Sequence, residues 1–485
     1  MLKATAGTWI SYATTALFQV LFARSFGTTP EASAYVLTFA IAVGIGAVFI
    51  GTTQVVYLPR LLARGGDVLT EIVWRVVRIT WFALATFLIL AAGADLIAPV
   101  LAPSLERAGV DLANLIRLAC AFGFSQVLVG QLAVLCWARG ARFVPAVSPA
   151  LPSILASIPL LAGAMQSTAS VYLLLTVGSA VQVVLLGVAG GRNLRFSREP
   201  ADRSEEPPTL VSFSTWAFAQ LVVPFAIWVA ARASPTGGAD FNYAYRSIAV
   251  AQALIVGGIT YAALPDWSDF FRTEARGALE RSIAQTVSVA ALALSAAAGV
   301  GLVAAEPLVR LAFQRGSFTA HDTHVVSTII VGGLAGFAAE GVMLVLSQAI
   351  LAQRRIRVGI AFGMGRSVGL LLAVATFGLI GGPVGVAVGY SIANVVALGA
   401  QIGYVWRAGI VTRRQARLAR STALVAASTG VTAALLAAMN VPWVAGAAIV
   451  LAVFASSVIG LHDSLPKLRT PGVVTVDGAR EPAEI

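Results

Sequence analysis

Apolar stretches of roughly 18 to 25 residues follow one another along nearly the whole chain, and each could cross the hydrocarbon core of a bilayer as one α-helix. Hydrophobic residues make up 58% of the sequence and charged residues 11%, so too few polar side chains remain to cover a water-soluble protein of 485 residues. The sequence therefore predicts an all-α polytopic membrane protein and excludes a soluble globular domain.

The hydropathy pattern predicts about 14 transmembrane helices. They are expected near residues 5–24, 34–58, 79–102, 112–137, 146–166, 169–190, 210–231, 240–264, 282–304, 324–351, 358–380, 382–406, 421–439 and 441–461. An even number of spans with both termini inside puts most of the 33 Lys and Arg residues in cytoplasmic loops, as the positive-inside rule requires. The N- and C-termini are therefore predicted to be cytoplasmic. The net charge of +11 is expected to face anionic lipid headgroups rather than nucleic acid.

Residues 23–59 and 231–265 share a pattern of polar residues. Each segment has Ala-Arg at the outer end of a helix, a turn containing Gly, Thr and Pro, a tyrosine at the start of the next helix, and a Leu-Pro exit. The matching tyrosines are Tyr35 and Tyr243. Two apolar hairpins can share such features by chance, but the shared polar positions favour a true repeat. Both copies begin on the same side, so they are parallel repeats, and transporters commonly bind substrate between two such halves.

The polar segment 191–209 is predicted to be a cytoplasmic linker, because its charges and consecutive prolines suit an exposed connection. It separates an N-terminal lobe, residues 1–190 with the first six helices, from a C-terminal lobe, residues 210–420 with the next six. Residues 421–461 are expected to form two extra helices. Residues 462–485 are polar and contain several prolines, which predicts a disordered cytoplasmic tail.

Three segments carry a resemblance to a known family. The sequence YRSIAVAQALIVGGITYAALPDWSDFF, which begins at Tyr245, resembles the helix 8 signature of the MviN/MurJ-type lipid II flippases. EPLVRLAFQRGSFTAHDT, residues 306–323, is similar to the family's external loop between helices 9 and 10. ARSFGTTPEASAY, which begins at Ala23, is similar to its turn between helices 1 and 2.

The resemblance implies membership of the multidrug/oligosaccharidyl-lipid/polysaccharide exporter superfamily. The fold it implies has two six-helix lobes, related as parallel repeats, around a central cavity, with two C-terminal helices added in residues 421–461. It also implies a location in the bacterial cytoplasmic membrane.

Arg246 stands near the start of a segment that then runs apolar to Leu264. A charged side chain within the membrane is costly unless it faces protein or a water-filled cavity, so Arg246 is predicted to point inward. The resemblance matches it to the family's cavity arginine on helix 8, which would meet the pyrophosphate of a lipid-linked sugar. A guanidinium suits that role because it stays ionised and offers paired donors to phosphate oxygens. The alternative is that Arg246 reaches the outer interface and has no other role.

Four more residues are candidate substrate contacts in the cavity: Asn242, Tyr243, Arg24 and Arg232. Asn242 and Tyr243 lie one turn before Arg246 on the same predicted helix. Arg24 and Arg232 end the first and seventh helices on the outer side. The alternative for these two arginines is a role as helix-end anchors.

Glu340 and Arg366 are two further charges within predicted spans. One hypothesis is an ion pair in the cavity or an ion-coupling carboxylate. The other, which we favour, is a structural bridge between adjacent antiparallel helices, since neighbouring helices can satisfy both charges without a substrate.

The sequence departs from the lipid II flippase pattern at charged positions. Those flippases carry further arginines in the first helix and at the inner end of the second, and an aspartate near the start of the second. Aligned on ARSFG, these positions fall on Tyr12, Phe18, Gly46 and Ser33. The cavity is therefore expected to be less basic than in the family pattern.

The sequence predicts an alternating-access exporter that moves a polyprenyl-pyrophosphate-linked saccharide, lipid II or a related cell-envelope glycan precursor, to the outer leaflet. Catalytic and metal-binding constellations and a nucleotide-binding loop of the Walker type are not found, so we expect neither an enzyme nor a cofactor. The expected partners are the lipid-linked substrate, membrane lipids and cell-envelope synthesis proteins. The alternatives are a transport-inactive scaffold in cell-envelope assembly and a drug or cation exporter of the same superfamily.

Overall fold

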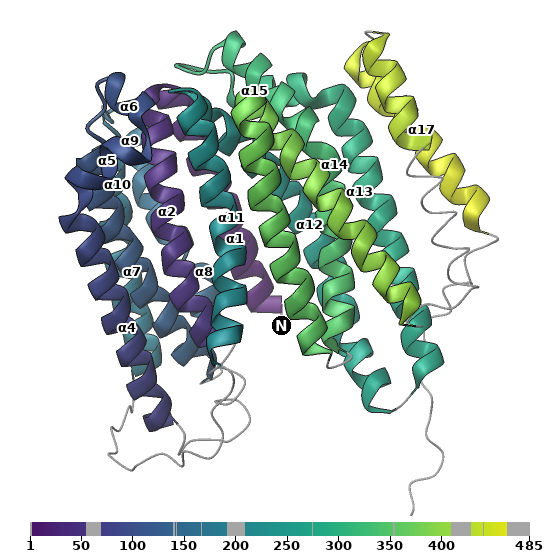
Figure 1. The fold of residues 1–485 in the computed structure, drawn as a ribbon, viewed down its shortest axis with the longest axis horizontal. Coiled ribbons are helices and arrows are strands. Elements are labelled where there is room, and N and C mark those ends of the chain that lie inside the picture. Colours follow the sequence, from purple (N-terminus) through teal and green to yellow (C-terminus); the bar gives the residue numbers. More distant parts are fainter. Residues whose placement is uncertain are drawn as a thin grey trace, which may run out of the picture.

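The computed structural model describes residues 2–54, 69–138, 141, 143–165, 167–191, 209–273, 275–352, 355–408, 428–439 and 441–462. Within these ranges the chain forms helices and no strand, which confirms the all-α prediction (Figure 1). The helices are α1 (Leu2–Phe26), α2 (Pro30–Thr52), α4 (Leu69–Ala92), α5 (Ala94–Leu101), α6 (Pro103–Arg107), α7 (Leu112–Ala138), α8 (Phe143–Val147), α9 (Ala150–Leu161), α10 (Thr168–Gly191), α11 (Thr209–Ala233), α12 (Gly237–Arg272), α13 (Arg276–Phe313), α14 (Ala320–Ala352), α15 (Ile356–Arg407) and α17 (Trp443–His462).

Where the structure describes them, the predicted spans coincide with helices, with some changes in shape. Seven helices of the described chain are long and apolar enough to cross a membrane, or eight if the bent pair α4 and α5 counts as one. That pair bends by 73°, so the predicted span 79–102 is broken near its outer end. The total of about 14 spans stays a prediction.

Local sequence explains where two important helices begin. At α2, Thr29 is the N-cap and accepts a hydrogen bond from Ala32 N (3.3 Å), and Pro30 occupies the first turn, where its missing N–H costs nothing. At α14, Asp322 N donates to Thr319 Oγ1 (3.3 Å) while Asp322 Oδ2 accepts from Thr319 N (2.7 Å). This reciprocal pair is a capping box and fixes the start of α14 at the outer end.

Helix α15 contains two of the predicted spans. Gly382 has φ 57° and ψ −145°, outside helical geometry, and Pro383 follows it, so the chain reverses there without a loop. The two arms pack closely, since a Cβ at Gly389 would press against the Ala373 carbonyl. The predicted spans 358–380 and 382–406 are therefore the arms of one tight hairpin.

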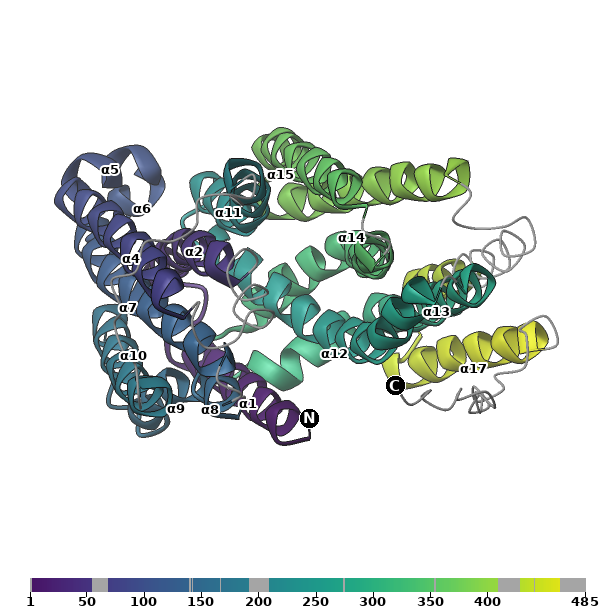
Figure 2. The same ribbon diagram turned by 90° about the horizontal axis from the view of Figure 1, so that it is seen from below.

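The helices form two lobes, with α1 to α10 in the N-terminal lobe and α11 to α15 in the C-terminal lobe (Figures 1 and 2). Helix α17 lies beside α13, where Gly446 sits against Val303 and Gly299 against Val450. The two-lobe fold is thus as predicted, and in the segment predicted to form two added C-terminal helices the described residues form a helix at Ser428–Ala438 and α17. Most of the predicted linker 191–209, the start of the segment 421–461 and nearly all of the tail 462–485 lie outside the described residues, so those boundaries stay predictions.

Candidate functional site

The two lobes are joined at the end that the topology predicts to be outer, through contacts that we call the outer seal. Its hydrogen bonds run from Tyr243 Oη to Gly27 O (3.0 Å), Gly238 N to Ser33 Oγ (3.0 Å), Ser317 N to Arg24 O (2.8 Å), Ser317 Oγ to Ser25 O (3.0 Å), Thr28 Oγ1 to Asp322 Oδ1 (2.6 Å), Ser104 Oγ to Ala231 O (2.7 Å) and Trp228 Nε1 to Leu101 O (2.6 Å). Between described residues, the hydrogen bonds that cross from one lobe to the other all lie at this end. The structure is therefore closed at this end.

Two glycines make this close approach possible. Gly27 and Gly316 have φ of 57° and 64°, a region that side chains with a Cβ disfavour. A Cβ at Gly27 would overlap the carbonyl of Ser317, and one at Gly316 would overlap the carbonyl of Arg24. Each glycine thus lets its own backbone approach a carbonyl of the opposite lobe.

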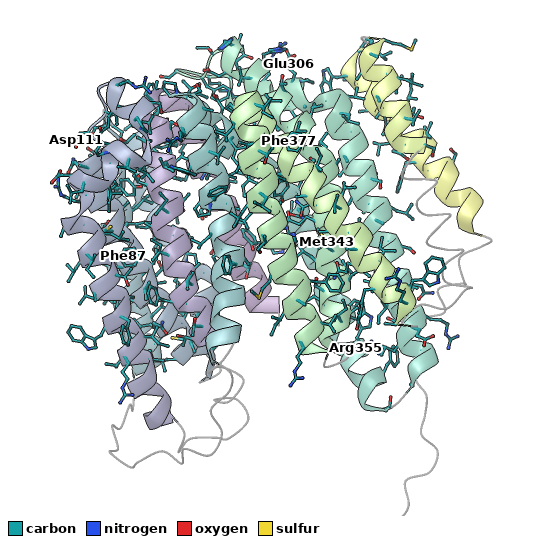
Figure 3. The ribbon with its side chains drawn as sticks, in the orientation of Figure 1. Phe87, Asp111, Glu306, Met343, Arg355 and Phe377 are labelled. Carbon is teal, nitrogen blue, oxygen red and sulfur yellow. The ribbon has the colours of Figure 1, made fainter. Side chains whose placement is uncertain are left out.

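We expect Gly27→Ala to open the outer seal, because it adds both backbone strain and overlap with the opposite lobe. The measurement is the distance between spin labels at Asp111 and Glu306, which lie at the outer end of the two lobes (Figure 3). The distance distribution should shift to longer values. The matched control is Gly109→Ala, where φ is 80° but no atom lies within 4 Å of the added Cβ, so the wild-type distribution should remain. An unchanged distribution in Gly27→Ala would contradict the role of this contact.

A cavity of about 800 Å³ lies between the lobes. Two of its walls come from α1 and α12, which lie on the facing sides of the two lobes (Figure 2). One further side is closed by the last turn of α7, by α8, and by Pro149 just before α9. The lining residues are Thr8, Ser11, Tyr12, Thr15, Ala16, Gln19, Trp137, Pro145, Ala146, Pro149, Arg246, Ala249, Val250, Ala253 and Leu254. The volume is within the range of about 300 to 1,000 Å³ usual for small-molecule sites.

Arg246 lies on the α12 wall of this cavity, as the sequence predicted for an inward-pointing charge. It is half-buried, and it makes no hydrogen bond or ion pair with another described residue. Its charge lies close enough to interact with Tyr35 and Tyr245. Of the described lining residues it alone is charged. A guanidinium without a counter-ion in a membrane-embedded cavity is available to an anionic ligand.

The other four candidate contacts are not on the cavity wall. Tyr243 is fully buried in the outer seal against Phe313 and Phe318, and Asn242 is buried beside it. Arg24 is exposed at the outer end. The Arg232 guanidinium lies 5.6 Å from the Trp228 ring centre. All four are at the outer end, so any contact with substrate belongs to a state in which the seal is open.

Glu340 and Arg366 form an ion pair that joins α14 to the first arm of α15. The Glu340 carboxylate also accepts a hydrogen bond from Tyr390 Oη, and Arg366 Nε donates to Asn394 Oδ1 (2.8 Å), both on the second arm. The four side chains therefore hold three helical segments together inside the C-terminal lobe. Neither charge lines the cavity, so the geometry fits the structural bridge rather than a substrate contact.

Sequence reasoning named Tyr12 only as a departure from the flippase pattern, and it missed the polar residues that line the cavity beside Tyr12 on α1: Thr8, Ser11, Thr15 and Gln19. Because hydroxyl and amide side chains are common in membrane helices, no single one of them is a strong signal. Their spacing of three, four and seven residues could have found them, since it places all four, with Tyr12, on one face of a helix.

The four positions that depart from the flippase pattern have different environments. Tyr12 lines the cavity and is 52% exposed. Phe18 packs in the core against Phe22, and Ser33 belongs to the outer seal. Gly46 is buried, and a Cβ added there would lie in ordinary contact with the Gly123 carbonyl and Val127. The cavity is therefore less basic than in the pattern, as predicted, with Tyr12 as a neutral group on its wall.

Comparison with known proteins gives one family match. The family described as lipid II flippase MurJ matches residues 22–454. Among solved structures, the chain is similar to a lipid II flippase MurJ in an inward closed conformation, with a TM-score of 0.77, 16% identity, and coverage of 96% of this chain and 100% of that one. An inward-facing multidrug resistance MATE family transporter gives a TM-score of 0.60 at 15% identity, covering 84% of this chain and 95% of that one. An outward-facing MATE family transporter gives 0.53 at 16% identity, covering 86% and 96%. No curated protein matches the sequence.

Proposed function

Since the chain belongs to the lipid II flippase MurJ family, we propose that it translocates a polyprenyl-pyrophosphate-linked saccharide, lipid II or a related cell-envelope glycan precursor, across the cytoplasmic membrane. It is a multi-pass membrane protein that transports rather than catalyses a reaction. We propose the bacterial inner membrane as its location, with both termini in the cytoplasm.

The observation that carries the proposal is the guanidinium of Arg246, which lines the cavity between the two lobes and makes no ion pair with another described residue. The phosphate oxygens of a lipid-linked sugar would supply the missing negative charge through paired hydrogen bonds. The saccharide head would occupy the cavity while the polyprenyl tail stays in the bilayer. No polar head would then have to cross hydrocarbon without partners.

The proposed orientation of the outer seal implies a direction of loading. With the outer end closed by hydrogen bonds, the head would enter from the cytoplasmic half of the membrane. Breaking the seal and bringing the lobes together at the inner end would then release the head to the outer leaflet. Cell-envelope synthesis proteins that supply or use the lipid-linked saccharide are the proposed partners.

Native mass spectrometry of the purified full chain tests this function through the lipids that it retains. We expect polyprenyl-pyrophosphate saccharide to be enriched over an unrelated multi-pass protein purified from the same membranes. Transport of a fluorescent lipid-linked saccharide in proteoliposomes should follow.

Two other results would replace the proposal. Retention of bulk phospholipid alone, with no lipid-linked saccharide transported, would favour a transport-inactive scaffold in cell-envelope assembly. Efflux of cationic dyes without retention of lipid-linked saccharide would favour a drug or cation exporter. The cavity argues against the exporter, because no carboxylate is found among its described lining residues.

A further inference from the structure

The α1 wall of the cavity has a distinct chemical character. The set Thr8, Ser11, Tyr12, Thr15 and Gln19, which we call the α1 stripe, covers an arc of about 100° on the helix and about 16 Å of its length. The stripe carries hydroxyl and amide groups but no charge. Such a row of neutral polar groups facing a cavity is suited to a ligand rich in hydroxyl groups.

The opposite wall differs from the α1 stripe. On α12 the lining residues after Arg246 are Ala249, Val250, Ala253 and Leu254, all apolar. The cavity therefore has one neutral hydrogen-bonding wall, one apolar wall, and a single positive charge on the apolar side. A ligand that fits it has one anionic group and a neutral polar body.

Some of the polar groups already have protein partners, and this identifies the ones that remain for a ligand. Ser11 Oγ donates to Ala146 O (2.8 Å), and Thr15 Oγ1 lies 3.4 Å from Ser153 Oγ, so both help to hold α1 against α8 and α9. Gln19 is half-buried and makes no hydrogen bond with another described residue. Its amide offers two donors and two acceptor lone pairs to the cavity. Gln19 is therefore the part of the stripe most dependent on a ligand for its hydrogen bonds.

Two aromatic side chains complete the polar wall. Tyr12 is 52% exposed, and Trp137, at the end of α7, lines the same cavity. Each offers a flat apolar ring together with one polar group. A sugar ring has the complementary form, with C–H groups on its faces and hydroxyls at its edge.

Resting on the proposed function, we propose that the α1 stripe is the saccharide-binding surface of the cavity, and that the ligand is recognised through its sugar as much as through its phosphate. Arg246 alone can give paired hydrogen bonds to the oxygens of one phosphate. A second phosphate meets no further cation among the described lining residues. Removal of the sugar should therefore weaken binding more than removal of one phosphate.

The test measures the affinity of the full chain in nanodiscs for three lipids with the same polyprenyl chain: the pyrophosphate disaccharide, the monophosphate disaccharide and the sugar-free pyrophosphate. In Gln19→Leu, binding of both disaccharide lipids should weaken about threefold to tenfold, as expected for lost hydrogen bonds. Binding of the sugar-free lipid should not change. The matched control is Thr14→Val, because Thr14 lies on α1 outside the cavity and bonds to its own helix at Ile10 O and Ser11 O.

The outcomes separate this inference from the proposed function. If Gln19→Leu binds all three lipids like wild type, or weakens all three equally, the saccharide-binding role is wrong while the flippase proposal stands. If wild type binds none of the three lipids, the proposed function itself fails. Unfolding temperatures equal to that of Thr14→Val show that a loss of binding is not a loss of fold.

Discussion

Arg246→Ala is expected to weaken binding of a polyprenyl-pyrophosphate saccharide about 100-fold, since hydrogen bonds to charged groups contribute about 1.5 to 3 kcal/mol. The reason is that the described cavity wall offers no second cation to take over the phosphate. Transport in proteoliposomes should fall in proportion. The measurement is the dissociation constant together with the initial rate of transport at lipid concentrations well below the wild-type dissociation constant.

Two further variants test whether the loss of binding is specific to the guanidinium of Arg246. Arg246→Lys should recover part of the affinity, because it keeps the charge but loses the paired donors. Arg107→Ala is the matched arginine control: its Nε bonds only to Pro103 O (3.1 Å) on the exposed outer surface, so binding should remain as in wild type. Wild-type affinity in Arg246→Ala would remove the main support for the proposed function.

Glu340→Leu is expected to destabilise the protein by about 3 to 5 kcal/mol, the usual cost of leaving one partner of a buried ion pair alone. Arg366 would keep its charge inside the C-terminal lobe with only Asn394 as a neutral hydrogen-bond partner. The unfolding temperature in detergent should fall by several degrees. The three helical segments that meet at this pair should then exchange amide protons faster than the N-terminal lobe.

The double variant Glu340→Leu, Arg366→Leu separates a structural pair from a functional one. Replacing both charges by apolar side chains is often neutral for stability, so the double variant should recover much of the loss. If the pair is purely structural, transport recovers as well. Recovered stability without recovered transport would instead assign the carboxylate a role in coupling to an ion.

The fold could be predicted from the sequence because hydropathy and turn residues act locally. Where the structure describes them, the expected spans coincide with helices, and the Gly382–Pro383 break lies where the expected spans 358–380 and 382–406 meet. The two tyrosines of the repeat show the limit of this reasoning. Tyr243 donates to Gly27 O across the outer seal, whereas the Tyr35 hydroxyl is buried with no hydrogen-bond partner. The hydrogen bonds between the lobes lie in the outer seal. Equivalent positions of the two repeats therefore have different neighbours.

The candidate site was harder to predict for two reasons. A single charge within an apolar segment is a strong signal, so Arg246 could be identified from its cost in the membrane. The sequence predicts the same cavity for four more residues: Arg24, Arg232, Asn242 and Tyr243. They lie at the closed end instead, because the position of a side chain depends on which end of the transporter is closed. Which end is closed depends on how the two lobes pack together, so no single segment of the sequence predicts it.

The outer seal also bears on how such a protein can change over time. Most of its hydrogen bonds have a main-chain carbonyl or N–H on at least one side, at Arg24, Ser25, Gly27, Gly238 and Ser317 among others. A main-chain N–H or carbonyl remains present when the side chain of its residue is replaced. The outer seal can therefore form in relatives whose residues at these positions differ. What evolution must keep fixed is the small size of Gly27 and Gly316, where the two main chains nearly touch.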